Sequence, residues 1–249
     1  QNALWALNVS DCAVAIPHGL RVNPCIGAYC ANTSYTMDND SLTLLWRGVR
    51  LPPPMQDLAQ LDVTVTITKR PRGQSGVSLR GAVALSATNH ARLAPSRVCL
   101  QSFALPTLGS IPLQNPDTEA MFIPYFFGHV GQCAGNCKMD LLKSADGMQH
   151  EFGWMPNGNS RAMQWFAYWS NKPSRSLGLY ASAHDPLSRI QLALTSGEYR
   201  QLDGAGGAAA LHWWHIPDDP LAALTPAAPW LMPYEVVLQG FESLAPYNS

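Results

Sequence analysis

The stretch GWMPNGNSRAMQWFAYWSNKPSRSLGLYASAHDP, residues 153–186, decides the fold of this chain. A strand places residues i and i+2 on the same side. From 161 to 170 this puts apolar side chains on both faces, so we expect both faces to be covered; Met163, Trp165, Ala167 and Trp169 share one face, and Gln164, Phe166 and Tyr168 share the other. Asn-Lys-Pro-Ser at 171–174 supplies turn residues, and the alternation resumes over 177–183. These residues predict a hairpin at the centre of a large sheet.

The same period of two recurs along the chain. It is clearest over 61–69, where apolar residues alternate with Asp and Thr, as in a strand with one buried and one wet face. We predict further strands at 41–51, 77–86, 98–105, 188–194, 211–216 and 234–241. The aromatic, proline-containing segment 121–128 is expected at an edge or in a loop that fills the core. No amphipathic helix and no repeat of fixed period is predicted.

The fold class that follows is all-β: a large antiparallel two-sheet β-sandwich. We assign it to residues 41–249. Residues 1–40 are rich in Cys, Asn, Pro and Gly, and we expect them to form an irregular N-terminal segment that is held by disulfides and carries glycans.

Composition narrows the partners of this chain. Only 13% of the 249 residues are charged and the formal net charge is -1, so no basic field is available for nucleic acid or an anionic membrane. No apolar run approaches the roughly 20 residues of a membrane span. The sequence also starts on mature-looking residues, which favours a processed N-terminus. A surface so poor in charge predicts attached sugar or burial in an assembly.

Six cysteines, in two close pairs and two distant singles, are typical of disulfides in a secreted protein. The simplest of many pairings joins Cys25 to Cys30, Cys133 to Cys137, and Cys12 to Cys99. The alternative is a zinc site at Cys133 and Cys137, but no matching Cys/His pair follows at finger spacing. We therefore favour disulfides and predict no metal and no cofactor.

Asn8, Asn32 and Asn39 each begin an Asn-x-Ser/Thr sequon. Single sequons arise by chance and some remain unused, but three beside cysteines strengthen one another. They favour a secretory route and an extracellular location.

Residues that point to chemistry are few. His184 and Asp185 suit hydrogen bonds to a sugar or acid–base work, although an Asp-Pro corner more commonly bonds its own turn. Sugars stack their C–H faces on exposed aromatic rings. Trp213 and Trp214 are adjacent and must face opposite sides of a strand, so we expect one in the core and Trp214 exposed.

Trp154, in loop-like sequence, is the second tryptophan that we predict to stack on sugar. Core packing is the alternative for most of the eight tryptophans. His212 and His215 are three residues apart, which puts them on opposite strand faces and argues against joint metal binding.

Five segments in order carry a resemblance to a known family: LxLxWRG at 42–48, FxPYxxG at 122–128, MQWFAYW at 163–169, GLYxxxHDP at 178–186 and PYxVVLxxF at 233–241. Together they resemble the N-terminal β-supersandwich, similar to the galactose mutarotase-like fold, of glycoside hydrolase-like proteins related to the endo-α-N-acetylgalactosaminidases. In that family the cleaving carboxylates lie on a following catalytic barrel, for which this sequence shows no strand–helix alternation. The resemblance therefore implies a carbohydrate-associated fold without catalytic residues.

Three functional hypotheses follow. The first is a secreted, N-glycosylated, carbohydrate-associated module that is non-catalytic by itself, with carbohydrate or neighbouring glycoprotein chains as partners. The second is a structural subunit of an extracellular fibre or coat, in which copies form a homo-oligomer through strand edges. The third is a fragment of a glycoside hydrolase whose barrel is missing.

Overall fold

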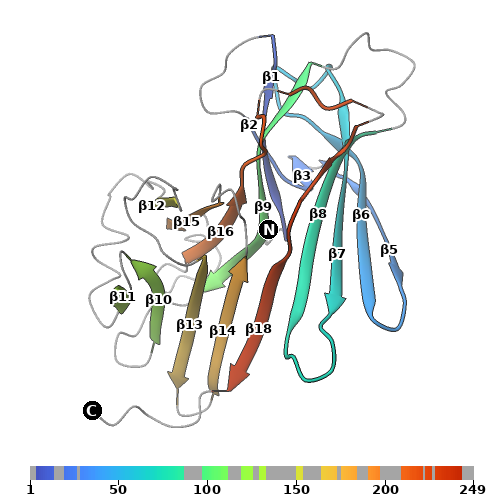
Figure 1. Cartoon of the computed structure of the whole chain (residues 1–249). Helices are drawn as coiled ribbons and strands as arrows, with labels where there is room; N and C mark the ends of the chain where they lie inside the picture. Colours follow the sequence, from blue (N-terminus) through green and yellow to red (C-terminus); the bar gives the residue numbers. More distant parts are fainter. Residues whose placement is uncertain are drawn as a thin grey trace.

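The computed structural model describes residues 4–13, 20–26, 29–86, 97–111, 119–125, 129–132, 150–153, 164–172, 175–183, 190–196, 209–220, 222–225 and 228–242. Every strand pairing in this part of the chain is antiparallel, and the strands form two large sheets and one two-stranded ribbon. The predicted all-β sandwich is confirmed. Figure 1 shows the strands, coloured from blue to red in the order of the sequence.

The first sheet has six strands. In spatial order they are β12 (His150–Gly153), β15 (Ile190–Ser196), β16 (Ala209–His215), β9 (Val98–Ile111), β1 (Ala6–Asp11) and β2 (Leu20–Val22). The two-stranded ribbon consists of β3 (Cys25–Ile26) and β4 (Tyr29–Cys30).

The second sheet has ten strands. In spatial order they are β11 (His129–Gln132), β10 (Glu119–Tyr125), β13 (Trp165–Lys172), β14 (Arg175–Ala183), β18 (Val236–Glu242), β8 (Val77–Leu85), β7 (Gln60–Lys69), β6 (Ser41–Arg50) and β5 (Asn32–Met37), and β17 (Trp230–Leu231) pairs β8 beside this path. Strands β18 and β8 share only the register from Val236↔Leu79 to Leu238↔Val77, so this short ladder joins the two halves of the sheet.

The central hairpin is confirmed. Strands β13 and β14 pair from Trp165↔Ser182 to Lys172↔Arg175, with β10 and β18 on their other sides. The aromatic segment predicted at an edge or in a loop is instead strand β10, which lies between β11 and β13. That prediction was wrong because proline removes one backbone donor but does not stop the remaining residues from pairing.

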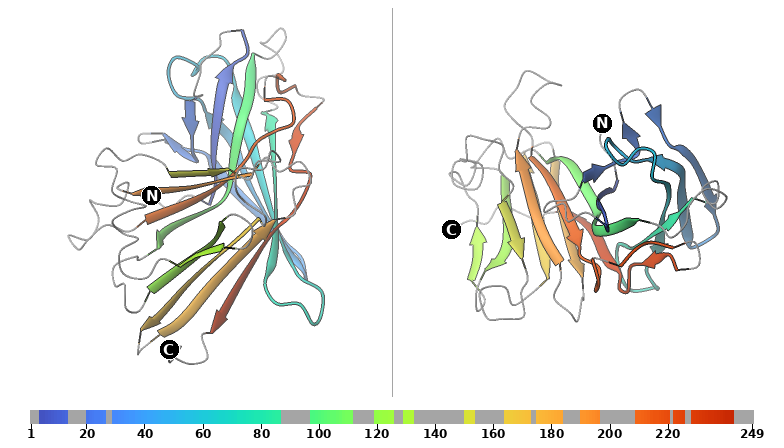
Figure 2. Two further views of the ribbon diagram at one scale, coloured as in Figure 1. Left: turned by 60° about the vertical axis from the view of Figure 1, so that its left-hand side comes forward. Right: turned by 90° about the horizontal axis from the view of Figure 1, so that it is seen from above.

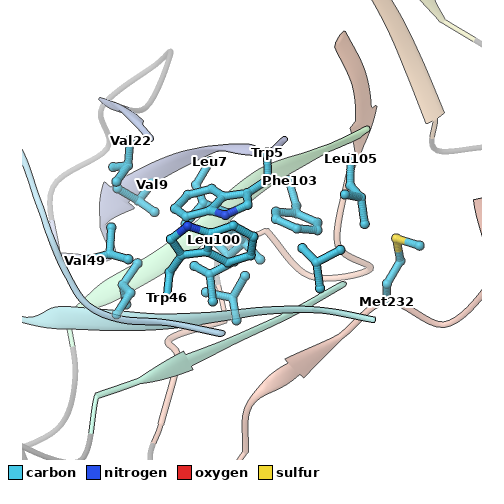
Figure 3. Close-up of a cluster of buried hydrophobic side chains, with 14 of the residues drawn as sticks. Trp5, Leu7, Val9, Val22, Trp46, Val49, Leu100, Phe103, Leu105 and Met232 are labelled. Carbon is cyan, nitrogen blue, oxygen red and sulfur yellow. The ribbon is translucent and has the colours of Figure 1, made fainter. Parts of the chain in front are cut away.

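The core lies between the two sheets, which the views in Figure 2 show packed over one another. Leu61, Val63 and Val65 of β7 are fully buried, as their alternation predicts, and they pack in one cluster with residues of β1, β9 and β16. In Figure 3, Trp5 before β1 lies against Trp46 of β6, with ring centroids 5.6 Å apart in an edge-to-face arrangement. Such aromatic pairs add stability beyond their buried area.

The predicted irregular character of residues 1–40 is wrong for the part that the structure describes. Strand β1 lies between β2 and β9, and its Leu7 and Val9 are fully buried in the core. Strand β5 belongs to the other sheet. The turns, cysteines and sequons of this segment obscure two strands of the sheets, of which β1 contributes to the core and β5 forms an exposed edge, so the segment is part of the sandwich rather than a leader to it.

Candidate functional site

The outer face of β13, β14 and β18 carries a group of aromatic side chains. The register places Ala167 opposite Tyr180, Trp169 opposite Gly178 and Gly178 opposite Phe241, and directly opposed residues share a face. The neighbouring positions on these strands point the other way, and there Tyr168, Ala181 and Val236 are buried in the core. The aromatic residues therefore lie on the side away from the core. We call this group the aromatic face: Trp165, Trp169, Tyr180 and Phe241.

Four half-buried aromatic side chains on three adjacent strands share this outer surface. The rings of Trp165 and Tyr180 lie 5.9 Å apart with 32° between their planes. Phe241 lies directly over Gly178, where an added Cβ would come within 2.0 Å of its ring. The glycine thus lets the Phe241 ring settle against the sheet, and Figure 1 shows the three strands side by side.

The described side chains that share this face on the three strands carry no charge. Besides the aromatic residues they are Ala167, Gly178, Ser182, Val237 and Gln239. Gln239 lies opposite Tyr180 in the register and offers an amide donor and acceptor beside the rings. An uncharged aromatic surface with a few polar groups at its side suits the C–H face of a neutral sugar ring.

Sequence reasoning missed this site because it expected both faces of the hairpin to be covered. The overlooked signal in the sequence lies in the neighbouring strand β18. Gln239 shares the face of Tyr180, and a polar residue at this position indicates a side in contact with water.

Trp214 does not have the predicted exposure. It faces the opposite side of β16 from Trp213, as expected, but both are buried, at 4% and 1% exposure. Trp214 packs with Ala6 and Ala104, and the Arg21 guanidinium lies over its ring at 5.9 Å. The prediction failed because alternation separates two faces without saying what covers each. Sugar stacking on Trp214 would require Arg21 to move away.

The other predicted sugar-contacting residues, Trp154, His184 and Asp185, lie outside the described residues. So do Cys133 and Cys137. Neither the sugar contacts nor that cysteine pair is placed by the structure, and both stay predictions.

His215 is a buried group in the core rather than part of the aromatic face. Its Nε2 lies 2.6 Å from the Leu105 carbonyl oxygen and its Nδ1 lies 2.5 Å from the Tyr234 hydroxyl. Because a carbonyl only accepts, Nε2 carries the proton and donates, and the tyrosine hydroxyl donates to Nδ1. Burial lowers the pKa of His215 to about 4, although the bond to Leu105 acts in the opposite direction. A neutral imidazole that ties β16 to β9 and to the segment before β18 is a structural element.

One predicted disulfide is confirmed. Cys12 and Cys99 are bonded, with their Cα atoms 5.4 Å apart, and they join the end of β1 to β9 across 87 residues of sequence. Beside this bond Arg97 donates to the Asp11 carboxylate, and this hydrogen bond is the main cause that lowers the pKa of Asp11. Cys30 is also disulfide-bonded and lies opposite Cys25 in the β3–β4 ribbon, which supports the predicted pairing of these two.

The three sequon asparagines have different surroundings. Asn32 and Asn39 are exposed, on β5 and in the turn that follows it. Asn8 lies within β1, where its Nδ2 donates to the Ser102 hydroxyl at 3.0 Å and the next two residues, Val9 and Ser10, are buried. Nδ2 is the atom that a glycan would occupy, so this geometry favours Asn32 and Asn39 over Asn8.

Within the described ranges, no group of three or more His, Cys, Asp or Glu side chains gathers as a metal site would require. The same part of the chain contains no helix that is long and apolar enough to cross a membrane.

Comparison with known proteins leaves the aromatic face as the main functional evidence. No protein-family model matches the chain, and no curated protein is significantly similar to it.

Proposed function

We propose that this chain is an extracellular, N-glycosylated β-sandwich module that binds neutral carbohydrate on its aromatic face and does not cleave it. One observation carries the proposal: four half-buried aromatic side chains on the outer face of β13, β14 and β18, with no described charge among them. Half-buried aromatic rings lose little side-chain entropy on binding, because their neighbours already hold them.

Two further features support the extracellular setting and the ligand class. The disulfide between Cys12 and Cys99 fits an oxidising compartment. The resemblance to the supersandwich of glycoside hydrolase-like proteins implies a fold associated with carbohydrate. Binding at this face is equally compatible with a fragment of such an enzyme.

The proposal is tested by affinity electrophoresis and calorimetry against a panel of neutral and acidic polysaccharides, with wild type, Trp165→Ala and Tyr180→Ala. We expect binding to one or more neutral glycans and a loss of about fivefold or more in affinity in each variant, since one aromatic stacking contact contributes roughly 1 kcal/mol or more. Leu231→Ala is the matched control, because Leu231 is an exposed large apolar residue on β17, which pairs β8 outside the aromatic face.

Binding that survives in both aromatic-face variants, or no binding to any glycan on the panel, would contradict the proposal. Near-ultraviolet circular dichroism and the melting temperature of each variant separate lost binding from lost folding.

A structural subunit of an extracellular coat or fibre is the second candidate function. The observation that favours it is strand β5, whose six residues are all exposed at one edge of the ten-stranded sheet. An open, head-to-tail contact would build a fibre, whereas a two-fold contact closes as a dimer.

A further inference from the structure

The strongest unexplained feature outside the aromatic face is the edge strand β5. Among the described strands only β6 pairs with it, and its sequence, NTSYTM, contains neither proline nor charge. Exposed edges normally carry such residues because a bare edge is a template for pairing with another chain. Tyr35 and Met37 are 71% and 75% exposed, whereas most large apolar side chains of the described residues are buried or half-buried.

Tyr35 and Met37 lie on the core-facing side of their sheet. The register runs Tyr35↔Leu44↔Val65 and Met37↔Leu42↔Ile67, and Val65 is fully buried. The apolar inner face thus continues beyond the core onto β5, where the side chains are exposed. Figure 1 shows β5 and β6 at the end of the ten-stranded sheet farthest from β10 and β11.

The turn between β5 and β6 fixes which backbone groups point outward. The Asp38 amide donates to the Ser41 carbonyl, which makes this the hydrogen-bonded pair that closes the hairpin. Hydrogen-bonded and non-hydrogen-bonded pairs alternate along an antiparallel ladder, and the register is regular from Met37↔Leu42 to Asn32↔Arg47. The N–H and C=O groups of Thr33, Tyr35 and Met37 therefore point away from β6.

We propose that β5 pairs antiparallel with β5 of a second copy of this chain, about a two-fold axis at Tyr35. An axis at Tyr35, the middle one of the three residues with outward backbone groups, is the register in which all three pair with one another. The resulting register pairs Tyr35 with the second copy's Tyr35, and Thr33 with its Met37. All outward donors and acceptors of the strand are then satisfied, and the two apolar faces lie on the same side.

Charge complementarity at the ends of the strand supports a second copy as the occupant. In this register Asn32 lies opposite Asp38 of the other copy, and Arg47 lies one strand further in, opposite Asn32. Their Cα atoms would be separated by two strand spacings, about 10 Å, which an Arg and an Asp side chain can span together. The Asp38 carboxylate accepts from Asp40 N and from the Ser41 amide and hydroxyl, so its turn holds it at this end of the strand.

The size of the contact sets the expected strength. Six residues of one strand from each copy bury less than the roughly 1,200 Å² of a standard stable interface, so the dimer is weak. We expect a dissociation constant on the order of 10–100 µM. A glycan on Asn32 projects from the outer face, opposite the side of Tyr35 and Met37, and leaves the apolar side open.

The first test is sedimentation equilibrium of the full glycosylated chain from about 1 to 500 µM. We expect a reversible monomer–dimer equilibrium for wild type and a loss of dimer of at least tenfold in Tyr35→Pro, which removes an outward donor without breaking a bond to β6. In the matched control, Tyr35→Thr, the backbone donor remains and part of the association is kept. A wild-type chain that stays monomeric over the whole range, or that forms open polymers, would overturn the proposal.

The second test reads the register and is independent of sugar binding. Position 34 lies opposite position 36 of the second copy in a non-hydrogen-bonded pair, where Cα atoms are about 4.5 Å apart and a disulfide can form. Ser34→Cys and Thr36→Cys chains should cross-link with each other under mild oxidation much faster than either cross-links with itself. Equal or faster self-cross-linking would contradict the two-fold register even if a dimer were present.

Discussion

Trp165 and Tyr180 lie ring to ring, 5.9 Å apart, on the outer side of the sheet whose inner side holds the core. They come from adjacent strands of the hairpin that organises the chain. This placement makes the hairpin both the centre of one sheet and the support of a surface that can bind a ligand.

Two glycines that sit under aromatic rings should respond differently to substitution. An added Cβ at Gly81 comes within 2.0 Å of the Phe103 ring, and at Gly178 it comes equally close to the Phe241 ring. Phe103 is fully buried and cannot yield, so we expect Gly81→Ala to lower the free energy of unfolding by about 1–3 kcal/mol. Phe241 is half-buried and can turn outward, so Gly178→Ala should cost less in urea denaturation.

Gly178, compared with Gly240, also tests the binding surface. Gly178→Ala displaces the Phe241 ring and should weaken carbohydrate binding, whereas Gly240→Ala, whose Cβ meets only the Gly178 carbonyl oxygen at 3.9 Å, should bind normally. Equal binding by both variants would show that Phe241 takes no part.

Stability should fall with pH in a window set by His215. Its folded pKa of about 4 lies below the unfolded value of 6.5, so the unfolded chain binds the proton more tightly. The stability is complete above pH 6.5 and is lost as the pH falls toward 4. Between pH 7 and 4.5 we expect wild type to lose about 2–3 kcal/mol more than His215→Gln, measured by urea unfolding. The same pH dependence in both proteins would assign the effect to other groups.

Loss of the Cys12–Cys99 bond should destabilise the sandwich strongly. The bond closes a long loop, from the end of β1 to β9, and Cys99 is fully buried. We expect Cys12→Ser/Cys99→Ser to lose about 2–5 kcal/mol of unfolding free energy. Non-reducing peptide mapping of wild type should recover Cys12 joined to Cys99 and Cys25 joined to Cys30; any other partner for Cys12 would contradict the fold.

Glycan occupancy should follow exposure. In material from a secretory host, glycopeptide mass spectrometry should find sugar on Asn32 and Asn39 and bare Asn8. The reason is that the Asn8 amide is bonded to Ser102 inside a three-strand ladder. A glycan on Asn8 in folded protein would show that β1 does not pair as described.

The elements that the sequence predicted well are those in which one period runs unbroken. Strand β7 and the β13–β14 hairpin are examples, because the alternation of side chains and the turn residues together are compatible with only one local structure. Strands β1 and β5 were missed because short strands between cysteines and sequons give too few periods to count. Their pairing with β9 and β6 is decided by long-range packing.

The site was harder to predict than the fold. Alternation places Trp165 and Trp169 on one face and Tyr168 on the other, but it cannot tell which face meets the second sheet. Trp214 failed for the same reason, because Arg21 and two alanines from other strands cover it. Only the three-dimensional register shows that Trp165, Tyr180 and Phe241 share an outward side.

Tryptophan indole signals in a proton–nitrogen correlation spectrum test carbohydrate binding at the aromatic face most directly. Titration of the full chain with the glycan that binds most tightly should shift the Nε1–H signals of Trp165 and Trp169, identified through Trp165→Phe and Trp169→Phe. The signals of the buried Trp5, Trp46 and Trp213 should stay in place. Shifts confined to other tryptophans, or no shift at a saturating glycan concentration, would contradict the account.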